Sequence, residues 1–278
     1  MGSIITASPS KSALGVEGYA LITGGGSGIG RATSLLLARE HSLGIALADV
    51  NETGLLKVKK ELEDVATNPE FRCITVVVNV ADEKSVRDMV AKVVQEFGRI
   101  DFAANVAGIG AVKGPIAEGK IDDWNKMMAV NLTGVWLCVR EEILVMSGQK
   151  ARESASTYAP LQRGSIVNIA SLFGVAGGHH SGAYTAAKHG VVGVTRTSAL
   201  DHPEIKSNAV VPGYIETPLT SVPGEMRNNA LKKVNDWTPM KRFGRPEEVA
   251  ESVVWLLGDR SNFAHGSCLT LDGGYMAQ

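Results

Sequence analysis

Three side chains that could transfer a proton fall within one stretch of the chain, residues 170–188. Ser171 carries a hydroxyl, Tyr184 a phenol and Lys188 an amine. If Tyr184 opens a helix, Lys188 lies one turn further on the same face, where its ammonium group favours the phenolate. The Ser171 hydroxyl could then hydrogen-bond the substrate oxygen that the phenol protonates or deprotonates. Tyr and Lys also occur four residues apart by chance in many helices, so the pair needs support from its surroundings.

That support begins with a glycine-rich stretch near the start of the chain. Residues 18–23 form a short apolar run typical of a buried parallel strand, and the sequence GGGSGIG follows at 24–30. Gly24, Gly28 and Gly30 permit a tight turn and close backbone approach, and residues 31–39 continue as a helix. The spacing differs from the common G-x-G-x-x-G fingerprint. A strand before it and a helix after it still predict a helix N-terminus that could receive a pyrophosphate.

An acidic residue follows at the position that dinucleotide binding requires. Residues 44–49 are predicted as the second strand, which places Asp49 at its carboxyl end, about 20 residues after the last glycine of the loop. Its carboxylate would bind ribose hydroxyls and repel a 2′-phosphate. Because no Arg or Lys follows it directly or occurs in 24–30, NAD is favoured over NADP. The alternative is that Asp49 only caps a helix.

The rest of the chain alternates between strand and helix patterns. Further strands are predicted at 73–78, 100–105, 164–170, 208–213 and 267–272, with amphipathic helices between most of them. We therefore expect an α/β fold, a single-domain doubly wound parallel sheet of the Rossmann-like type, with about seven strands and helices on both faces. We also expect residues 1–17 to form a flexible arm, 18–278 the domain, 147–163 an exposed loop and about 214–240 a mobile substrate lid.

One long helical segment contains an amide that needs an explanation. Residues 121–140 are too long a periodic segment for one surface helix, and Asn131 lies in the middle of it. A buried amide there is either satisfied by backbone groups, or it bends the helix and holds a water.

Composition excludes several classes of function. With 278 residues, a net charge of -1 and no basic run, the chain has no general attraction for nucleic acid or an anionic membrane. No apolar run is long enough to span a membrane. The three cysteines, Cys73, Cys138 and Cys268, lack metal-ligand spacing, so we expect no metal, buried free thiols and a cytoplasmic protein.

Taken in order, these motifs resemble the short-chain dehydrogenase/reductase family, including its members in fungal secondary metabolism. The matching segments are TGGGSGIG at 23–30, NVAG at 105–108, NLTGV at 131–135, IVNIAS at 166–171, YTAAK at 184–188 and VPGYIETPL at 211–219. The resemblance extends from Gly18 to Tyr275. It implies a small-molecule alcohol or ketone substrate and a homodimer or homotetramer.

The resemblance also implies roles for particular residues. Tyr184 would be the general acid/base, and Ser171 would orient and polarise the substrate oxygen. Lys188 would lower the phenol pKa and bind the nicotinamide ribose, while Asn131 would hold a water that links Lys188 to solvent. Together, the motifs and the resemblance assign NAD binding to Gly24, Ser27, Gly28, Ile29, Gly30, Asp49, Asn79, Val80, Asn105, Ala107, Gly108, Tyr184, Lys188, Pro212, Gly213, Ile215 and Thr217.

The chain departs from the family pattern at a few positions. Asn79 stands where the family usually has Asp, which implies at most weaker adenine binding. Val106 replaces a second Asn, and the 201–207 connection is shorter than usual. The expected function is NAD-dependent hydride transfer between a bulky or cyclic secondary alcohol or ketone and the cofactor. The alternatives are a non-redox isomerisation, dehydration or cyclisation at the same site, or a nucleotide-sensing binding protein.

Overall fold

A computed structural model describes residues 12–152, 162–221 and 223–277. These residues build one seven-stranded sheet in the order β3-β2-β1-β4-β5-β6-β7, and each neighbouring pair of strands is parallel. The order reverses between β1 and β4, which is where a doubly wound sheet opens a crevice at the carboxyl ends of its strands. The predicted fold class is confirmed.

The strands are β1 (Tyr19–Thr23), β2 (Gly44–Asp49), β3 (Arg72–Val77), β4 (Phe102–Asn105), β5 (Gly164–Ile169), β6 (Ile205–Pro212) and β7 (Cys268–Leu271). The helices are α1 (Gly28–Arg39), α2 (Glu52–Val65), α3 (Glu83–Phe97), α4 (Ile121–Met128), α5 (Gly134–Gly148), α6 (Gly182–Asp201), α7 (Pro218–Ser221), α8 (Glu225–Trp237) and α9 (Pro246–Leu257). Shorter turns are η1 (Ile116–Glu118), η2 (Ala129–Thr133), η3 (Leu172–Gly174) and η4 (Asp259–Ser261).

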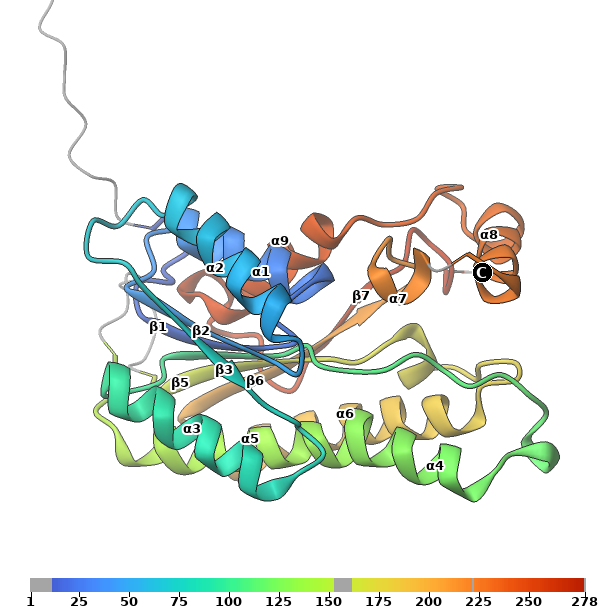
Figure 1. Cartoon of the computed structure of the whole chain (residues 1–278), viewed down its shortest axis with the longest axis horizontal. Coiled ribbons are helices and arrows are strands. Elements are labelled where there is room, and N and C mark those ends of the chain that lie inside the picture. The colour runs from blue at the N-terminus through green and yellow to red at the C-terminus, as the bar shows by residue number, and fades with distance from the viewer. Residues whose placement is uncertain (1–11, 153–161, 222, 278) are drawn as a thin grey trace, which may run out of the picture.

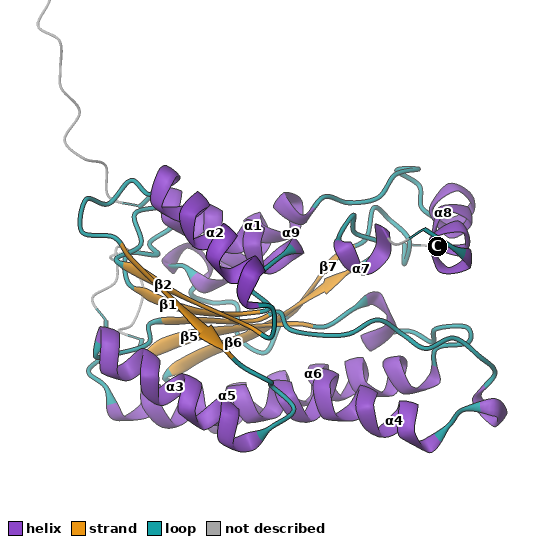
Figure 2. Ribbon diagram, viewed as in Figure 1, coloured by secondary structure: helices purple, strands orange, loops and turns teal. Residues whose placement is uncertain are grey.

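Two layers of helices cover the sheet (Figures 1 and 2). Helices α1, α2 and α9 pack on one face, where Leu37, Leu55 and Val253 join a fully buried cluster. Helices α3, α5 and α6 pack on the other face. The central strands are apolar without alternation because both of their faces are buried. This packing fixes the carboxyl edge of the sheet, where the loops that carry the candidate site residues emerge.

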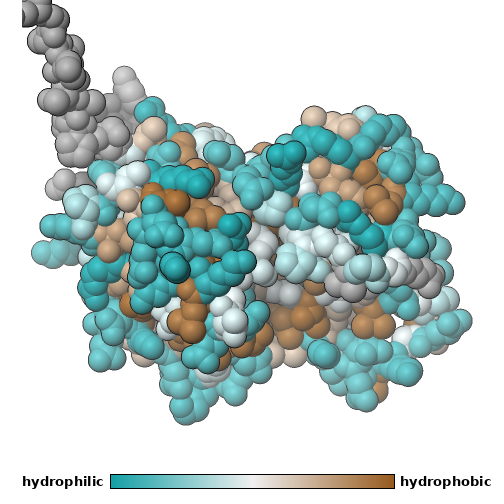
Figure 3. Space-filling view, turned by 45° about the horizontal axis from the view of Figure 1, so that its top comes forward, coloured by the Kyte–Doolittle hydropathy of each residue, from teal (hydrophilic) through white to brown (hydrophobic). Residues whose placement is uncertain are grey.

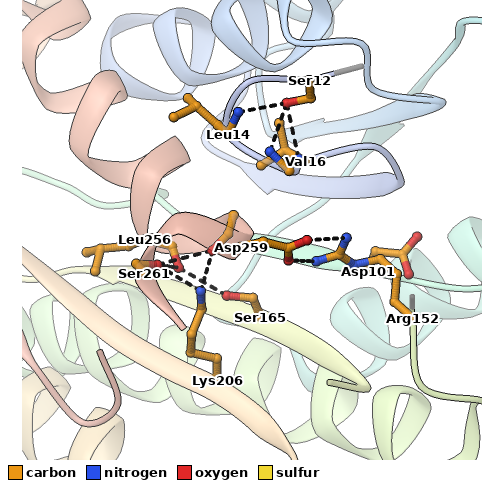
Figure 4. Close-up of polar contacts among 12 residues, drawn as sticks. Ser12, Leu14, Val16, Asp101, Arg152, Ser165, Lys206, Leu256, Asp259 and Ser261 are labelled. Carbon is orange, nitrogen blue, oxygen red and sulfur yellow. Dashed lines mark hydrogen bonds and ion pairs between the residues drawn. The ribbon is translucent and has the colours of Figure 1, made fainter. Parts of the chain in front are cut away.

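A buried polar cluster at the opposite end of the sheet ties the start of the chain to the domain (Figure 4). The ammonium of Lys206 donates to the carbonyl of Gly258 at 2.6 Å and to Ser261 Oγ at 2.8 Å, and Asp259 pairs with Arg152. The backbone N–H of Asp259 also donates to the carbonyl of Leu14 at 2.9 Å. These contacts supply hydrogen-bond and ion-pair partners to polar groups that are buried and would otherwise lack them.

Residues 12–17 differ from the loose arm that their sequence suggests. Val16 is fully buried, and Ser12 Oγ accepts three hydrogen bonds, from the backbone N–H groups of Leu14, Gly15 and Val16 at 3.2, 3.0 and 3.3 Å. This polar segment forms a turn because the Ser12 side chain provides a hydrogen-bond acceptor for the backbone N–H groups of the turn. Residues 1–11 of the expected arm lie outside the described residues.

Other segments also differ in their limits from the sequence-based prediction. β6 begins at Ile205, three residues before the predicted start, because the polar side chains of Lys206 and Ser207 are buried with hydrogen-bond partners. The long segment predicted over 121–140 is two α-helices, α4 and α5, joined by the π-helical turn η2. A π-helical turn bends a helix and often marks a functional site.

Candidate active site

The crevice at the carboxyl ends of β1, β2 and β4 holds a cleft with a volume of about 310 Å³. Many of the residues predicted to bind NAD line it: Gly24, Ser27, Gly28, Ile29, Asp49, Asn79, Val80, Ala107, Gly108 and Thr217. The surface is indented between its left and right parts in the space-filling view (Figure 3). Apart from Asp49, the described residues that line this cleft carry no charged side chain.

The glycine turn is shaped by close approach of backbone to backbone. Gly24 has a φ of 67°, and a Cβ there would lie 2.8 Å from the backbone nitrogen of Ala107. A Cβ on Gly30 would lie 2.2 Å from the carbonyl oxygen of Gly24. Only glycine fits these positions, so the turn after β1 packs directly against the turn after β4.

The first turn of α1 opens into this cleft without a local anion. Ser27 is the N-cap of α1, yet its side chain makes no capping hydrogen bond, and the first turn contains no acidic residue. The backbone N–H groups at this helix end therefore lack an intrahelical acceptor, and together with the helix dipole they form a site for an anion such as a pyrophosphate.

Asp49 lies at the end of β2 with both carboxylate oxygens oriented by the backbone. Its Oδ2 accepts from the N–H of Gly26 at 3.1 Å, and its Oδ1 accepts from the N–H of Asn51 at 3.0 Å. Each oxygen keeps lone-pair capacity for a further donor such as a ribose hydroxyl. The capping role weighed as an alternative belongs instead to Asn51, whose side chain caps α2.

Ser171 and Tyr184 meet at a second pocket beside the cleft. Ser171 leaves the end of β5 and caps η3, because its Oγ accepts from the N–H of Phe173 at 3.2 Å. Tyr184 lies in the first turn of α6 and hydrogen-bonds with Ser171. Burial raises the pKa of the Tyr184 phenol, and the hydrogen bond with Ser171 opposes that rise.

Lys188 follows Tyr184 by one helical turn and is buried. Its Nζ donates to the carbonyl oxygen of Ile169 at 2.7 Å and lies 5.8 Å from the centroid of the Tyr184 ring. Burial lowers the pKa of Lys188 to about 8. The amine is thus held by the end of β5, and in this structure it is the Ser171 hydroxyl, not Lys188, that offsets the effect of burial on the phenol.

Asn131 lies in η2 with its side-chain amide satisfied by one backbone residue. Its Oδ1 accepts from the N–H of Ile109 at 2.8 Å, and its Nδ2 donates to the carbonyl of Ile109 at 2.9 Å. A Cβ built on Gly108 would lie 3.2 Å from Asn131 Oδ1 and 4.0 Å from Lys188 Nζ, so both side chains border the same small space. Both alternatives weighed for Asn131 are therefore partly present, because backbone satisfies the amide and the helix changes its winding there. The water relay stays a prediction.

A family model described as enoyl-(acyl carrier protein) reductase matches residues 24–276. The chain belongs to the short-chain dehydrogenase/reductase family. A short-chain dehydrogenase of the fungus Penicillium roqueforti, anuF, is 35% identical over 96% of this chain and 98% of its own length. The 2,5-dichloro-2,5-cyclohexadiene-1,4-diol dehydrogenase of Sphingobium indicum is 38% identical over 92% of this chain and 96% of its own. The crystal structure of levodione reductase matches with a TM-score of 0.83 at 33% identity, over 95% of this chain and 99% of that one.

In this short-chain dehydrogenase/reductase the second pocket has a volume of about 140 Å³. It is lined by Ser171, Tyr184, Gly213 and Tyr214, and by side chains of the loop after β4 and of α7 and α8. Leu219 of α7 lines both this pocket and the cleft at the ends of β1, β2 and β4. The two spaces therefore adjoin at Leu219.

Some residues assigned to the site by sequence do not line either space. Asn105 is buried below the cleft and Pro212 ends β6. Ile215 is buried in the core and lines a separate pocket under Gly244. His179 and His180, which closely precede Tyr184, line neither space; they stack on each other at 3.8 Å between ring centroids and are exposed. Val175 is likewise 41% exposed.

The sequence reasoning missed other residues of the site. Val50, Val78, Val106, Ile109, Val130, Pro218 and Leu219 also line the cleft. Val50 directly follows Asp49, and that adjacency is a signal the sequence contained. Lys113 and Lys233 line the second pocket. Each comes from a loop or helix without a family motif, so no spacing pointed to them.

Neither a membrane-spanning helix nor a metal site is found among the described residues. None of the helices there is both long and apolar enough to cross a membrane. No group of three or more His, Cys, Asp or Glu side chains in that part of the chain is arranged to hold a metal ion.

Proposed function

We propose that this protein is an NAD-dependent oxidoreductase that interconverts a cyclic secondary alcohol and its ketone. The observation that carries the proposal is that Ser171 and Tyr184 line one pocket, which adjoins a cleft with the features of a dinucleotide site. Two of the relatives, a cyclohexadiene-diol dehydrogenase and a levodione reductase, have names that support a cyclic substrate.

The residues of the cleft fit a dinucleotide. The exposed N-terminus of α1 suits the pyrophosphate, and the oriented carboxylate of Asp49 suits a ribose diol. Because the described lining holds no Lys or Arg and contains Asp49, a 2′-phosphate would meet a negative charge there without a cation, which favours NAD over NADP. Asn79 also lines the cleft. Its side chain accepts from the N–H of Ala81 at 3.1 Å, which leaves its oxygen a second lone pair for the adenine amino group.

In the proposed reaction the alcohol loses two hydrogens separately, the carbon-bound one as a hydride and the hydroxyl one as a proton. When bound, the nicotinamide accepts or supplies the hydride of the substrate carbon. In oxidation the hydroxyl proton passes to the Tyr184 oxygen as the C=O bond forms, and in reduction Tyr184 returns that proton. The Ser171 hydroxyl hydrogen-bonds the same substrate oxygen and stabilises its developing charge. Lys188 holds an amine one helical turn from the phenol, bound to the carbonyl of Ile169. Asn131 holds the backbone of Ile109 in place through its side-chain amide.

The decisive experiment follows the absorbance of reduced cofactor with a panel of cyclic alcohols and ketones. Tyr184→Phe should remove turnover while NAD binding persists, and unchanged turnover would refute the role of the phenol. Asp49→Ala should weaken NAD far more than NADP, and equal losses would refute the cofactor assignment. Analysis of products formed without net change in the cofactor would instead reveal a non-redox reaction.

We also infer that the protein forms a homodimer or homotetramer. Helices α5 and α6 expose large apolar side chains, with Trp136 45% exposed, Leu144 64% and Leu200 82%. Trp255 on α9 is 38% exposed. Apolar patches on a helical face are typical of interfaces. Gel filtration with light scattering tests this, and a monomer at micromolar concentration would contradict it.

A further inference from the structure

Two lysines face the same aromatic ring at the substrate side of the site. Lys113, from the loop after β4, places its Nζ 5.7 Å from the centroid of Phe173. Lys233, from α8, places its Nζ 5.8 Å from the same centroid. The Phe173 ring in turn meets the Tyr184 ring edge-on, with 6.5 Å between centroids. Both amines are therefore one aromatic ring away from the phenol.

The described residues that line this pocket include no Asp or Glu to balance these charges. Lys113 Nζ donates to Ser181 Oγ, a neutral group, and within the described part of the chain Lys233 has no ion pair. Burial lowers the pKa of Lys113, and repulsion from the charge of Lys233 lowers it further. An anion between them would relieve that repulsion.

A general surplus of positive charge does not explain the pair. The whole chain has a net charge of -1, and elsewhere in the described structure long basic side chains are commonly paired, as Arg242 is with Glu248 at 2.7 Å. The remaining lining is largely apolar, with Leu172, Phe173 and Leu219 among its members. The pocket therefore combines an apolar body with an electropositive end, a pattern that selects an apolar molecule with one anionic group.

We propose that the substrate carries a carboxylate, held by Lys113 and Lys233, on a ring-sized apolar body that lies against Phe173. The volume of about 140 Å³ suits one six-membered ring, since a cavity of roughly 150 Å³ accommodates benzene. The substrate class is then a cyclic hydroxy acid or oxo acid. This inference rests on the proposed oxidoreductase function, because it assumes that the reacting hydroxyl lies at Ser171 and Tyr184.

The test compares matched acids and amides. Initial rates with NAD are measured for 4-hydroxycyclohexanecarboxylate and for its carboxamide, which has the same shape without the charge. The wild type should prefer the acid by about tenfold or more in kcat/KM, equivalent to about 1.4 kcal/mol. A wild type that uses the amide as well as the acid would overturn the proposal.

Variants of α8 locate the effect. Lys233→Gln should reduce the acid-to-amide ratio of kcat/KM about tenfold, and Lys233→Glu should reverse the preference. Lys232→Gln, its exposed neighbour on the same helix, is the matched control and should leave the ratio unchanged. Equal losses on both compounds in Lys233→Gln would refute anion binding and leave the oxidoreductase function intact.

Failure of the two proposals can be told apart. If neither compound is oxidised but cyclohexanol is, the carboxylate proposal fails alone. If no alcohol in the panel is oxidised, the proposed function fails. Calorimetric titrations with cyclohexanecarboxylate and with cyclohexanecarboxamide, in the presence of NADH, then show whether the pocket binds an anion. Tighter binding of the acid that is lost in Lys233→Gln supports the anion site, and equal affinities overturn it.

Discussion

Glu142 offers the sharpest test of the buried polar structure beneath the cofactor cleft. It lies on α5 with no exposed surface, and its Oε2 accepts from Asn105 Nδ2 at 2.9 Å. Its second oxygen, Oε1, has no hydrogen-bond partner among the described residues. Burial raises the pKa of Glu142 to about 7, although the hydrogen bond from Asn105 lowers it. A carboxyl in this environment is more easily buried as the neutral acid.

The direction of the pH dependence follows from proton binding. The unfolded chain releases the Glu142 proton near the ordinary value of 4.5, whereas the folded chain holds it to about 7. Between these values the folded state binds more protons, so the free energy of unfolding falls as pH rises. The difference is worth about 3 kcal/mol by pH 8, since each pKa unit corresponds to about 1.4 kcal/mol. Glu142→Gln, which cannot ionise, should remove this loss.

Urea unfolding of wild type and Glu142→Gln at pH 5 and pH 8 measures the effect. The two proteins should have similar stability at pH 5, and the variant should be more stable at pH 8 by about 3 kcal/mol at most, or roughly 2 to 4 °C in Tm per kcal/mol. Glu251→Gln, at an exposed position on α9, is the matched control and should not change the slope. A difference between wild type and Glu142→Gln that is the same at both pH values would refute the reasoning.

Three further outcomes are expected. Gly30→Ala should prevent stable folding or cofactor binding, because its Cβ would lie 2.2 Å from a carbonyl oxygen. Gly193→Ala in α6, where nothing lies within 4 Å of the new Cβ, should instead stabilise the protein by up to about 1 kcal/mol. Urea unfolding and NAD titration measure both effects. Because burial raises the pKa of Tyr184, kcat/KM for alcohol oxidation should rise with pH through the alkaline range and that for ketone reduction should fall, and a flat profile in both directions would contradict the role of the phenol. A disulfide reagent such as Ellman's should modify Cys268 first, since the other two thiols are buried with raised pKa values, and equally fast reaction of all three would contradict the burial.

The parts of the fold that sequence could predict are those with local signals. Strands buried on both faces are apolar runs in the sequence. The close backbone contacts at Gly24 and Gly30 require glycine, so the residue type itself predicts the tight turn. The start of β6 could not be predicted because Lys206 and Ser207 are polar, and only tertiary partners at Gly258 and Ser261 make their burial favourable. The same limit applies to residues 12–17, where Val16 is buried against elements far along the chain.

The candidate site divides in the same way. The Ser171, Tyr184 and Lys188 constellation could be predicted because the carboxyl ends of parallel strands meet at one edge, so motifs far apart in sequence converge there. The lining by Lys113 and Lys233 could not be predicted. These lysines are 120 residues apart in the sequence, and only the folded structure brings both amines to the ring of Phe173.

A series of buried, hydrogen-bonded side chains links the sheet to α6, the helix that carries Tyr184 and Lys188. Asn105, at the end of β4, donates both to Glu142 on α5 and to Asn168 on β5 at 3.0 Å. Asn168 donates in turn to Thr195 Oγ1 of α6 at 3.0 Å, two turns after the lysine that follows Tyr184. Each member is buried, so removing one would leave another without a partner in a low-dielectric environment. These bonds join α5, β4, β5 and α6, so a substitution that removes the Asn105 amide should take a hydrogen bond from both Glu142 Oε2 and Asn168 Oδ1 and lower the free energy of unfolding.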